Sequence, residues 1–139
     1  MEKSKMNNFI RKLSNETIND KIQWNYLTNL QNVSENSNPA VFFFLFEGEW
    51  RHIDFNDSYY VIINVGEVYI LNENIESGRD GTSVSGYNLY VHRECSENVF
   101  KLPCTQSNIY RLLNSINLSL SKKEADIESF IDEYLSNGD

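Results

Sequence analysis

The first stretch with a clear hydrophobic period runs from about residue 7 to residue 19. Its apolar positions follow helical spacing and are Phe9, Ile10, Leu13 and Thr17. This spacing gives a helix one apolar stripe, so it predicts a helix near the N-terminus. Beyond it the period changes to two, with Ile22, Trp24 and Tyr26 alternating. This alternation favours either a short strand or an ordered turn, with Trp24 in the core.

The middle of the chain predicts a sheet. Short runs rich in β-branched and aromatic residues, separated by turn residues, are typical of strands in hairpins. These runs cover 41–46, 50–55, 59–65, 68–71, 87–93 and 99–102. Residues 31–39 and 77–86 are rich in Gly, Ser and Asn and are expected to be loops. Because consecutive strands with short connections pair antiparallel, we predict an antiparallel meander of five or six strands.

The end of the chain is predicted to be helical again. Thr105 is a suitable N-cap for a helix whose apolar positions are Ile109, Leu112, Leu113 and Ile116. Ser121–Glu124 matches a capping box and predicts the start of a second helix. The apolar positions of that helix are Ile127, Phe130, Ile131, Tyr134 and Leu135. The predicted fold class is therefore α+β, with one N-terminal helix, the meander and two C-terminal helices in a single domain, 1–139.

Three of the predicted strands lack the alternation of a sheet with one wet face. They contain the continuous apolar runs 41–46, 59–63 and 68–71, which are typical of strands buried on both faces. Either helices cover both faces of a monomer, or one face forms an apolar interface with a second copy or another protein. The sequence leaves these two arrangements open.

Composition narrows the classes of function. The chain has 139 residues, 40% of them apolar, with 20 acids and 12 bases and a net charge of −8. A negative field repels phosphate backbones and anionic lipids, so we expect neither nucleic-acid nor membrane binding. The start of the chain lacks an apolar leader and the longest strictly apolar run is 40–46, so we expect a cytoplasmic protein.

Residues that could carry chemistry are few. His52 and His92 fall inside predicted strands, and neither a Gly-x-Ser-x-Gly nor a His-Glu-x-x-His motif occurs. Cys95 and Cys104 are interpreted as reduced thiols rather than a redox pair. The acids of the last helix do not follow calcium-loop spacing. We therefore expect no catalytic set, no metal and no cofactor.

Two surfaces are candidates for contact with a partner protein. Residues 77–86 form a Gly- and Ser-rich segment of the kind found in binding loops, and Trp50 stands at a predicted bend. The five acids of the last helix, which include Glu124, are predicted to lie mostly opposite its apolar stripe, where a basic partner can reach them. The predicted partner-binding residues are Trp50, Arg79, Asp80, Asp126, Glu128, Asp132 and Glu133.

Two terminal strings carry a resemblance. The first is Phe9-x-x-x-Leu13-x-x-x-Thr17-x-x-x-x-Ile22-x-Trp24, and the second combines 110–116 with 130–135. They resemble the ends of small uncharacterised proteins of low-GC Gram-positive bacteria and their phages. The resemblance implies a cytosolic accessory or mobile-element protein and supplies no site residues.

The sequence therefore predicts a small acidic protein-interaction domain, of the immunity, anti-defence or regulatory type, that binds a partner protein or a second copy of itself without catalysis. The alternative is a small-molecule binder or minor enzyme with a pocket under residues 78–86, using His52, His92, a tyrosine or Arg79. A third hypothesis is a nucleic-acid binder that uses the basic residues of the N-terminal helix despite the net charge.

Overall fold

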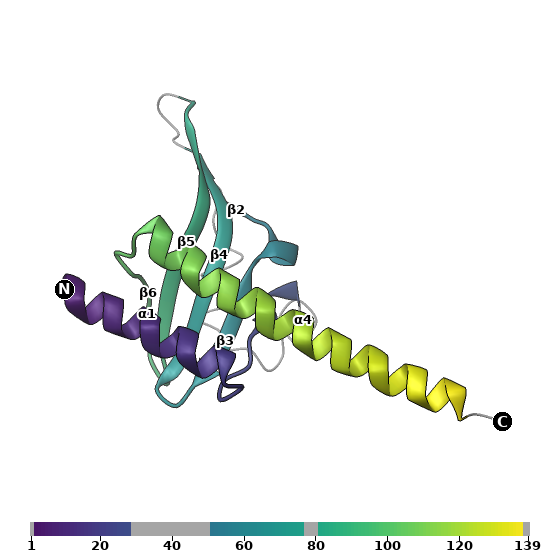
Figure 1. Cartoon of the computed structure of the whole chain (residues 1–139). Helices are drawn as coiled ribbons and strands as arrows, with labels where there is room; N and C mark the ends of the chain where they lie inside the picture. The colour runs from purple at the N-terminus through teal and green to yellow at the C-terminus, as the bar shows by residue number, and fades with distance from the viewer. Residues whose placement is uncertain (1, 29–50, 77–80, 138–139) are drawn as a thin grey trace. The chain divides into compact units, whose positions relative to one another are not determined.

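The computed structural model describes residues 2–28, 51–76 and 81–137 (Figure 1). The predicted strand 41–46, the predicted loop 31–39 and the candidate residues Trp50, Arg79 and Asp80 lie outside these ranges. The chain divides into two compact units, one formed by Met1–Gln23 with Tyr110–Asp139 and the other by Trp24–Ile109. We describe each unit by itself.

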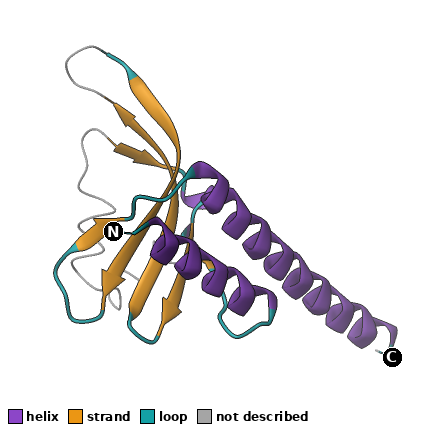
Figure 2. Cartoon of the chain, turned by 60° about the vertical axis from the view of Figure 1, so that its left-hand side comes forward, coloured by secondary structure: helices purple, strands orange, loops and turns teal. Residues whose placement is uncertain are grey.

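The unit Trp24–Ile109 contains an antiparallel sheet. Its strands are β1 (Asn25–Tyr26), β2 (Arg51–Ile53), β3 (Tyr59–Ile63), β4 (Gly66–Glu76), β5 (Ser83–Arg93) and β6 (Val99–Lys101). The spatial order is β1-β3-β4-β5-β6, and β2 pairs with β4 beyond the end of β3. The antiparallel sheet is confirmed, and β3 to β6 pair in chain order as a meander (Figure 2). The predicted pairing of consecutive strands is wrong for β2, which pairs with β4 instead of with β3.

The β4–β5 hairpin is longer than its apolar residues indicate. The two strands pair from Gly66 with Arg93 to Glu76 with Ser83, so the prediction that 83–86 belong to a loop is wrong. These positions are Ser, Val, Ser and Gly. They adopt a strand conformation because hydrogen bonds to β4 satisfy their backbone groups. The predicted strand 50–55 shortens to Arg51–Ile53, because the short 3₁₀ helix η1 (Phe55–Asp57) follows.

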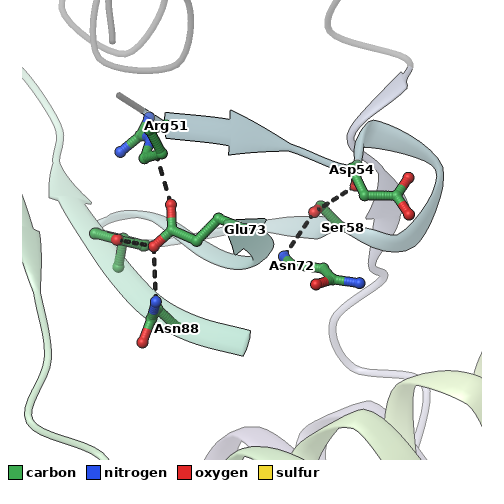
Figure 3. A network of polar contacts seen from close by, with 7 residues as sticks. Arg51, Asp54, Ser58, Asn72, Glu73 and Asn88 are labelled. Atoms are coloured by element: carbon green, nitrogen blue, oxygen red, sulfur yellow. Dashed lines mark hydrogen bonds and ion pairs between the residues drawn. The ribbon is translucent and has the colours of Figure 1, made fainter. Parts of the chain in front are cut away.

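A buried serine connects the two pieces of the strand that η1 interrupts. The Ser58 hydroxyl donates to the Asp54 carbonyl at 2.7 Å and accepts from the Asn72 backbone N–H at 2.9 Å. The Asp54 N–H donates to the Asn72 carbonyl at 2.9 Å. Ser58 thus replaces a ladder bond that β2 and β3 cannot supply where the chain turns away from β4 (Figure 3).

The middle of β4 is buried on both faces. The consecutive residues Val68, Tyr69, Ile70 and Leu71 are all at most 3% exposed, and alternate residues of a strand point to opposite faces. Tyr69 and Leu71 pack with Leu27 and Tyr90 in one cluster. The prediction of two buried faces is confirmed for 68–71. It is wrong at Ile62 of β3, which is 67% exposed.

The unit formed by the two ends of the chain contains the helix α1 (Lys3–Ile18) and most of α4 (Gln106–Ser136), drawn in purple in Figure 2. The N-terminal helix is confirmed, and its buried face includes Ile10, Leu13 and Thr17. The Thr17 hydroxyl donates to the Leu13 carbonyl at 2.6 Å, which satisfies this polar group on the buried face. No helix in the described ranges is long and apolar enough to cross a membrane.

The prediction of two C-terminal helices is wrong, because α4 is one continuous helix of 31 residues. Thr105 caps it as predicted, since its hydroxyl oxygen accepts from the Asn108 backbone N–H at 3.3 Å. Ser121–Glu124 does not start a new helix. Neither Gly nor Pro occurs between 106 and 136, and a serine inside a helix costs only tenths of a kcal/mol, about 0.5 relative to alanine. The capping-box pattern at Ser121–Glu124 therefore lies in the interior of α4 and does not start a helix.

Gly66 at the start of β4 provides the first testable prediction. A Cβ on Gly66, which has φ +150°, would lie 2.0 Å from the His92 carbonyl oxygen, whereas a Cβ on Gly81, with φ +69°, would meet nothing within 4 Å. We expect Gly66→Ala to lower the free energy of unfolding by about 3 kcal/mol or more, because backbone must move. Gly81→Ala should cost about 1–2 kcal/mol from its backbone conformation alone. Urea unfolding measures both, and equal losses would contradict the close packing at Gly66.

Candidate functional site

The second half of α4 is exposed, whereas the first half has a buried face. Every residue from 121 to 137 is exposed. In the first half, the apolar residues Ile109, Leu112, Leu113, Ile116 and Leu120 are buried. The exposed half is the yellow end of the helix in Figure 1.

Five large apolar side chains lie on this exposed half. They are Ile127, Phe130, Ile131, Tyr134 and Leu135, and we call them the α4 stripe. Their exposed fractions run from 48% at Ile131 to 73% at Tyr134. Single exposed apolar residues are ordinary on protein surfaces, but five at helical spacing form a contiguous patch.

The α4 stripe continues the buried face of the same helix. The spacing of Ile109, Leu112, Leu113 and Ile116 recurs at Ile127, Phe130, Ile131 and Tyr134, each 18 positions further along. With 3.6 residues per turn, this separation is about five full turns, so both sets lie on one face of the helix. The face that is buried in the first half is therefore open in the second half, and contiguous exposed apolar surface marks interaction sites.

The structure places four of the predicted contact residues on the same exposed half of α4 as the stripe. Asp126, Glu128, Asp132 and Glu133 are all exposed on α4. At roughly 100° per residue, Glu128 lies just beyond Leu135 at one edge of the stripe and Asp126 lies beyond Phe130 at the other, whereas Asp132 and Glu133 each lie about 60° beyond an edge. Glu124 lies near the same edge as Glu128, so Glu124, Asp126 and Glu128 are the acids nearest the stripe.

One lysine near the α4 stripe already has a partner in the chain. The Lys122 ammonium lies 3.4 Å from the Asp20 carboxylate in the turn after α1. Both side chains are largely exposed, so the ion pair contributes little to stability. It does offset the Lys122 charge locally, which leaves Lys123 as the other base in residues 121–137.

The sheet carries a separate open pocket of about 310 Å³. Its lining residues are His52, Ile53, Asp54, Asn72, Glu73, Asn74 and Ser85. Of the residues expected in a pocket, His52 lines it, His92 does not, and Arg79 lies outside the described ranges. The Asn74 amide donates to the Ser85 hydroxyl at 2.9 Å, while its carbonyl oxygen is buried without a hydrogen-bond partner. These groups can bind polar ligand atoms, but they do not pair a nucleophile with a base.

A buried glutamate under this pocket was missed by the sequence analysis. The Glu73 side chain is fully buried, and its Oε1 accepts from the Tyr90 hydroxyl and, at 2.7 Å, from the Asn88 amide (Figure 3). Its Oε2 lies 3.4 Å from Arg51 Nε. Burial, and then the bond to Glu73, raise the pKa of Tyr90. Glu73 escaped notice because it stands among Asn72 and Asn74 in a stretch without apolar alternation.

The two histidines have no catalytic arrangement. His92 is buried, its Nδ1 lies 2.7 Å from Glu67 Oε2, and its Nε2 lies 2.8 Å from the Ser96 carbonyl. Because a carbonyl can only accept, Nε2 carries a proton, and both ring nitrogens are engaged. Cys95 is exposed while His92 is buried, so the two do not form a nucleophile–base pair. His52 is exposed beside Glu76, with 3.8 Å between Nε2 and Oε1.

Both cysteines are free in the structure, as the sequence predicts. Cys104 is half-buried, and burial raises the pKa of its thiol. A thiol with a raised pKa is less often the reactive thiolate at neutral pH. Cys104 therefore lacks the microenvironment of a redox or nucleophilic cysteine.

The carboxylate of Asp57 organises the side of the sheet next to the pocket. It accepts hydrogen bonds from the hydroxyls of Tyr59 at 3.3 Å and Tyr87 at 2.5 Å, and from the Asn72 amide at 2.8 Å. Burial, followed by the nearby Asp57 charge, raises the pKa of Tyr59 to about 12. These donors satisfy the carboxylate, so the cluster stabilises η1 against β4 and β5.

Comparison with known proteins yields no relative. No protein-family model matches the chain, and neither a curated protein nor a solved structure is significantly similar to it.

The raised pKa of Tyr59 predicts a loss of stability at high pH. The unfolded chain ionises this phenol near its ordinary pKa of 10.0, whereas the folded chain raises the pKa of Tyr59 to about 12. The folded state therefore loses stability as the pH rises from 10 to 12. We expect Tyr59→Phe to reduce this loss, measured by urea unfolding across that range. Tyr134→Phe, at an exposed site, should follow the unmodified protein, and the same profile for all three would contradict the assignment.

Proposed function

We propose that this chain is a protein-interaction domain that binds a partner protein through the second half of α4 and catalyses no reaction of its own. The observation that carries the proposal is the exposed α4 stripe on the same helical face as the buried residues of the first half. The sheet and the first half of the helix would then act as the scaffold. In this reading the protein is a regulatory or inhibitory factor whose effect depends on its partner.

The spacing of the α4 stripe fits a known mode of recognition. Helices that bind in grooves use anchors at i, i+3, i+4 and i+7, and Ile127, Phe130, Ile131 and Tyr134 have this spacing. Full burial of a large apolar side chain contributes about 1.5–3 kcal/mol. Five such residues therefore supply enough favourable free energy to outweigh a substantial part of the cost of association. Aromatic anchors such as Phe130 and Tyr134 are typical of the residues that dominate interfaces.

The contacts of the histidines support a role without catalysis. A general base needs a ring nitrogen that is free to take a proton from a substrate. Glu67 and Ser96 occupy both nitrogens of His92 inside the protein. His52 faces Glu76 at the surface, and burial raises the pKa of the Cys104 thiol, which makes Cys104 a poor nucleophile at neutral pH.

Site-specific photo-crosslinking tests the proposal. A photoreactive phenylalanine analogue at position 130 would sit within the α4 stripe, whereas the same analogue at Ser129 would point away from it, about 160° round the helix. Both positions are exposed. In the cells that make the protein, we expect a discrete covalent adduct of higher mass from position 130 and none from position 129. The absence of an adduct at 130, or equal yields at both positions, would contradict the proposal.

A further inference from the structure

The charges around the α4 stripe indicate what kind of surface it binds. Residues 121–137 contain two lysines against five acids, a net charge of −3. Lys122 is already paired with Asp20. Three of the acids lie nearest the stripe, with Glu124 and Glu128 at one edge and Asp126 at the other. The apolar strip is therefore framed by negative charge along both edges.

We propose that the α4 stripe binds an apolar groove rimmed by lysines and arginines on a different protein. This inference rests on the proposed function, since it names the chemistry of the partner at the same surface. Partner interfaces combine an apolar centre with a polar rim, and complementary charges select the partner and speed association. A basic rim places a cation opposite each flanking carboxylate while Ile127, Phe130 and Ile131 fill the groove.

A second copy of this chain fits less well. Each copy has a net charge of −8, and pairing two α4 stripes would bring acidic flanks together. A parallel pair would place acids opposite the same acids. An antiparallel pair would bring the two lysines toward acids, but Lys122 lies beside Asp20, and residues 121–137 still carry five acids against two lysines. Like charges held close together disfavour association, so we expect the protein to be monomeric at neutral pH and low salt.

A lipid surface fits less well for the same reason. Amphipathic helices that lie on membranes have polar faces rich in lysine and arginine, which attract anionic head groups. The polar face of residues 121–137 is acidic instead, and the cytoplasmic leaflet is negatively charged. Vesicles of zwitterionic and of anionic lipid should therefore not retain the protein.

Synthetic peptides provide the test. Two amphipathic helical peptides of about 18 residues, five turns, share one leucine face, and one carries lysines and the other glutamates along the flanks. We expect the full-length protein to bind the lysine peptide and to bind the glutamate peptide at least about tenfold more weakly. Raising the salt from about 0.05 M to about 0.5 M should weaken the lysine complex about tenfold, because the flanking charges are exposed to solvent. Fluorescence anisotropy measures each affinity.

Variants separate the contribution of the apolar side chains to the peptide affinity from the contribution of the acidic side chains. Phe130→Ser with Ile131→Ser should abolish binding of the lysine peptide, and the fold should persist because both side chains are exposed. Glu124→Gln with Glu128→Gln should weaken it about five- to tenfold and reduce its salt dependence. Asp132→Asn, further from the stripe, is the matched control and should change the affinity less than about twofold. Circular dichroism checks that each variant remains folded.

The outcomes distinguish this inference from the proposed function. Equal binding of both peptides would overturn the basic rim while leaving the α4 stripe as a docking surface. Binding of neither peptide together with an adduct at position 130 would also overturn the basic groove but keep protein interaction. A stable dimer in light scattering that Phe130→Ser dissolves, or retention on vesicles, would replace the groove with a second copy or a membrane.

Discussion

Backbone pairing to β4 is the constraint on which the sheet depends. β4 pairs with β5 along one edge and with β3 and then β2 along the other, so its register fixes the face of almost every side chain in the unit. A slip of one residue would move Tyr69 and Leu71 out of the cluster with Leu27 and Tyr90. The register also brings the buried Glu73 to Asn88 and Tyr90. Gly66 begins this strand because only glycine fits against the His92 carbonyl.

The second half of α4, unlike the sheet, is not held by tertiary contacts. The helix continues to Ser136, although its last buried side chain is Leu120. The segment 121–137 lacks a buried side chain, and an isolated helix of that length is only marginally stable in water. A groove that covers the α4 stripe would stabilise this segment at the same time as it binds it. The acidic flanks keep the exposed stripe from pairing with other copies while they attract a basic rim. One segment can thus combine solubility with selectivity.

The sequence predicted the elements with strong periodicity and missed what depends on register or burial. The stripe Ile10, Leu13 and Thr17 and the meander were found because repeating apolar positions are local signals. The polar ends of β4 and β5 were missed, since a strand held by its ladder needs no apolar alternation there. Glu73 forms its buried hydrogen bonds only because the register of the two strands places Asn88 beside it. For the site, Asp126 and Glu128 were identified as exposed acids. The exposure of Phe130 was not foreseen, because periodicity shows which residues share a face and not whether anything covers that face.

Hydrogen–deuterium exchange along α4 tests the central claim most directly. The first half of the helix has a buried face, whereas 121–137 is exposed on all sides, and amides in segments without tertiary contacts open at a low free-energy cost. In the isolated protein at neutral pH, the account predicts slow exchange for 109–120 and fast exchange for 121–137. Equal, slow exchange along the whole helix would contradict it, because it would mean that the α4 stripe is already covered within the chain or by a second copy.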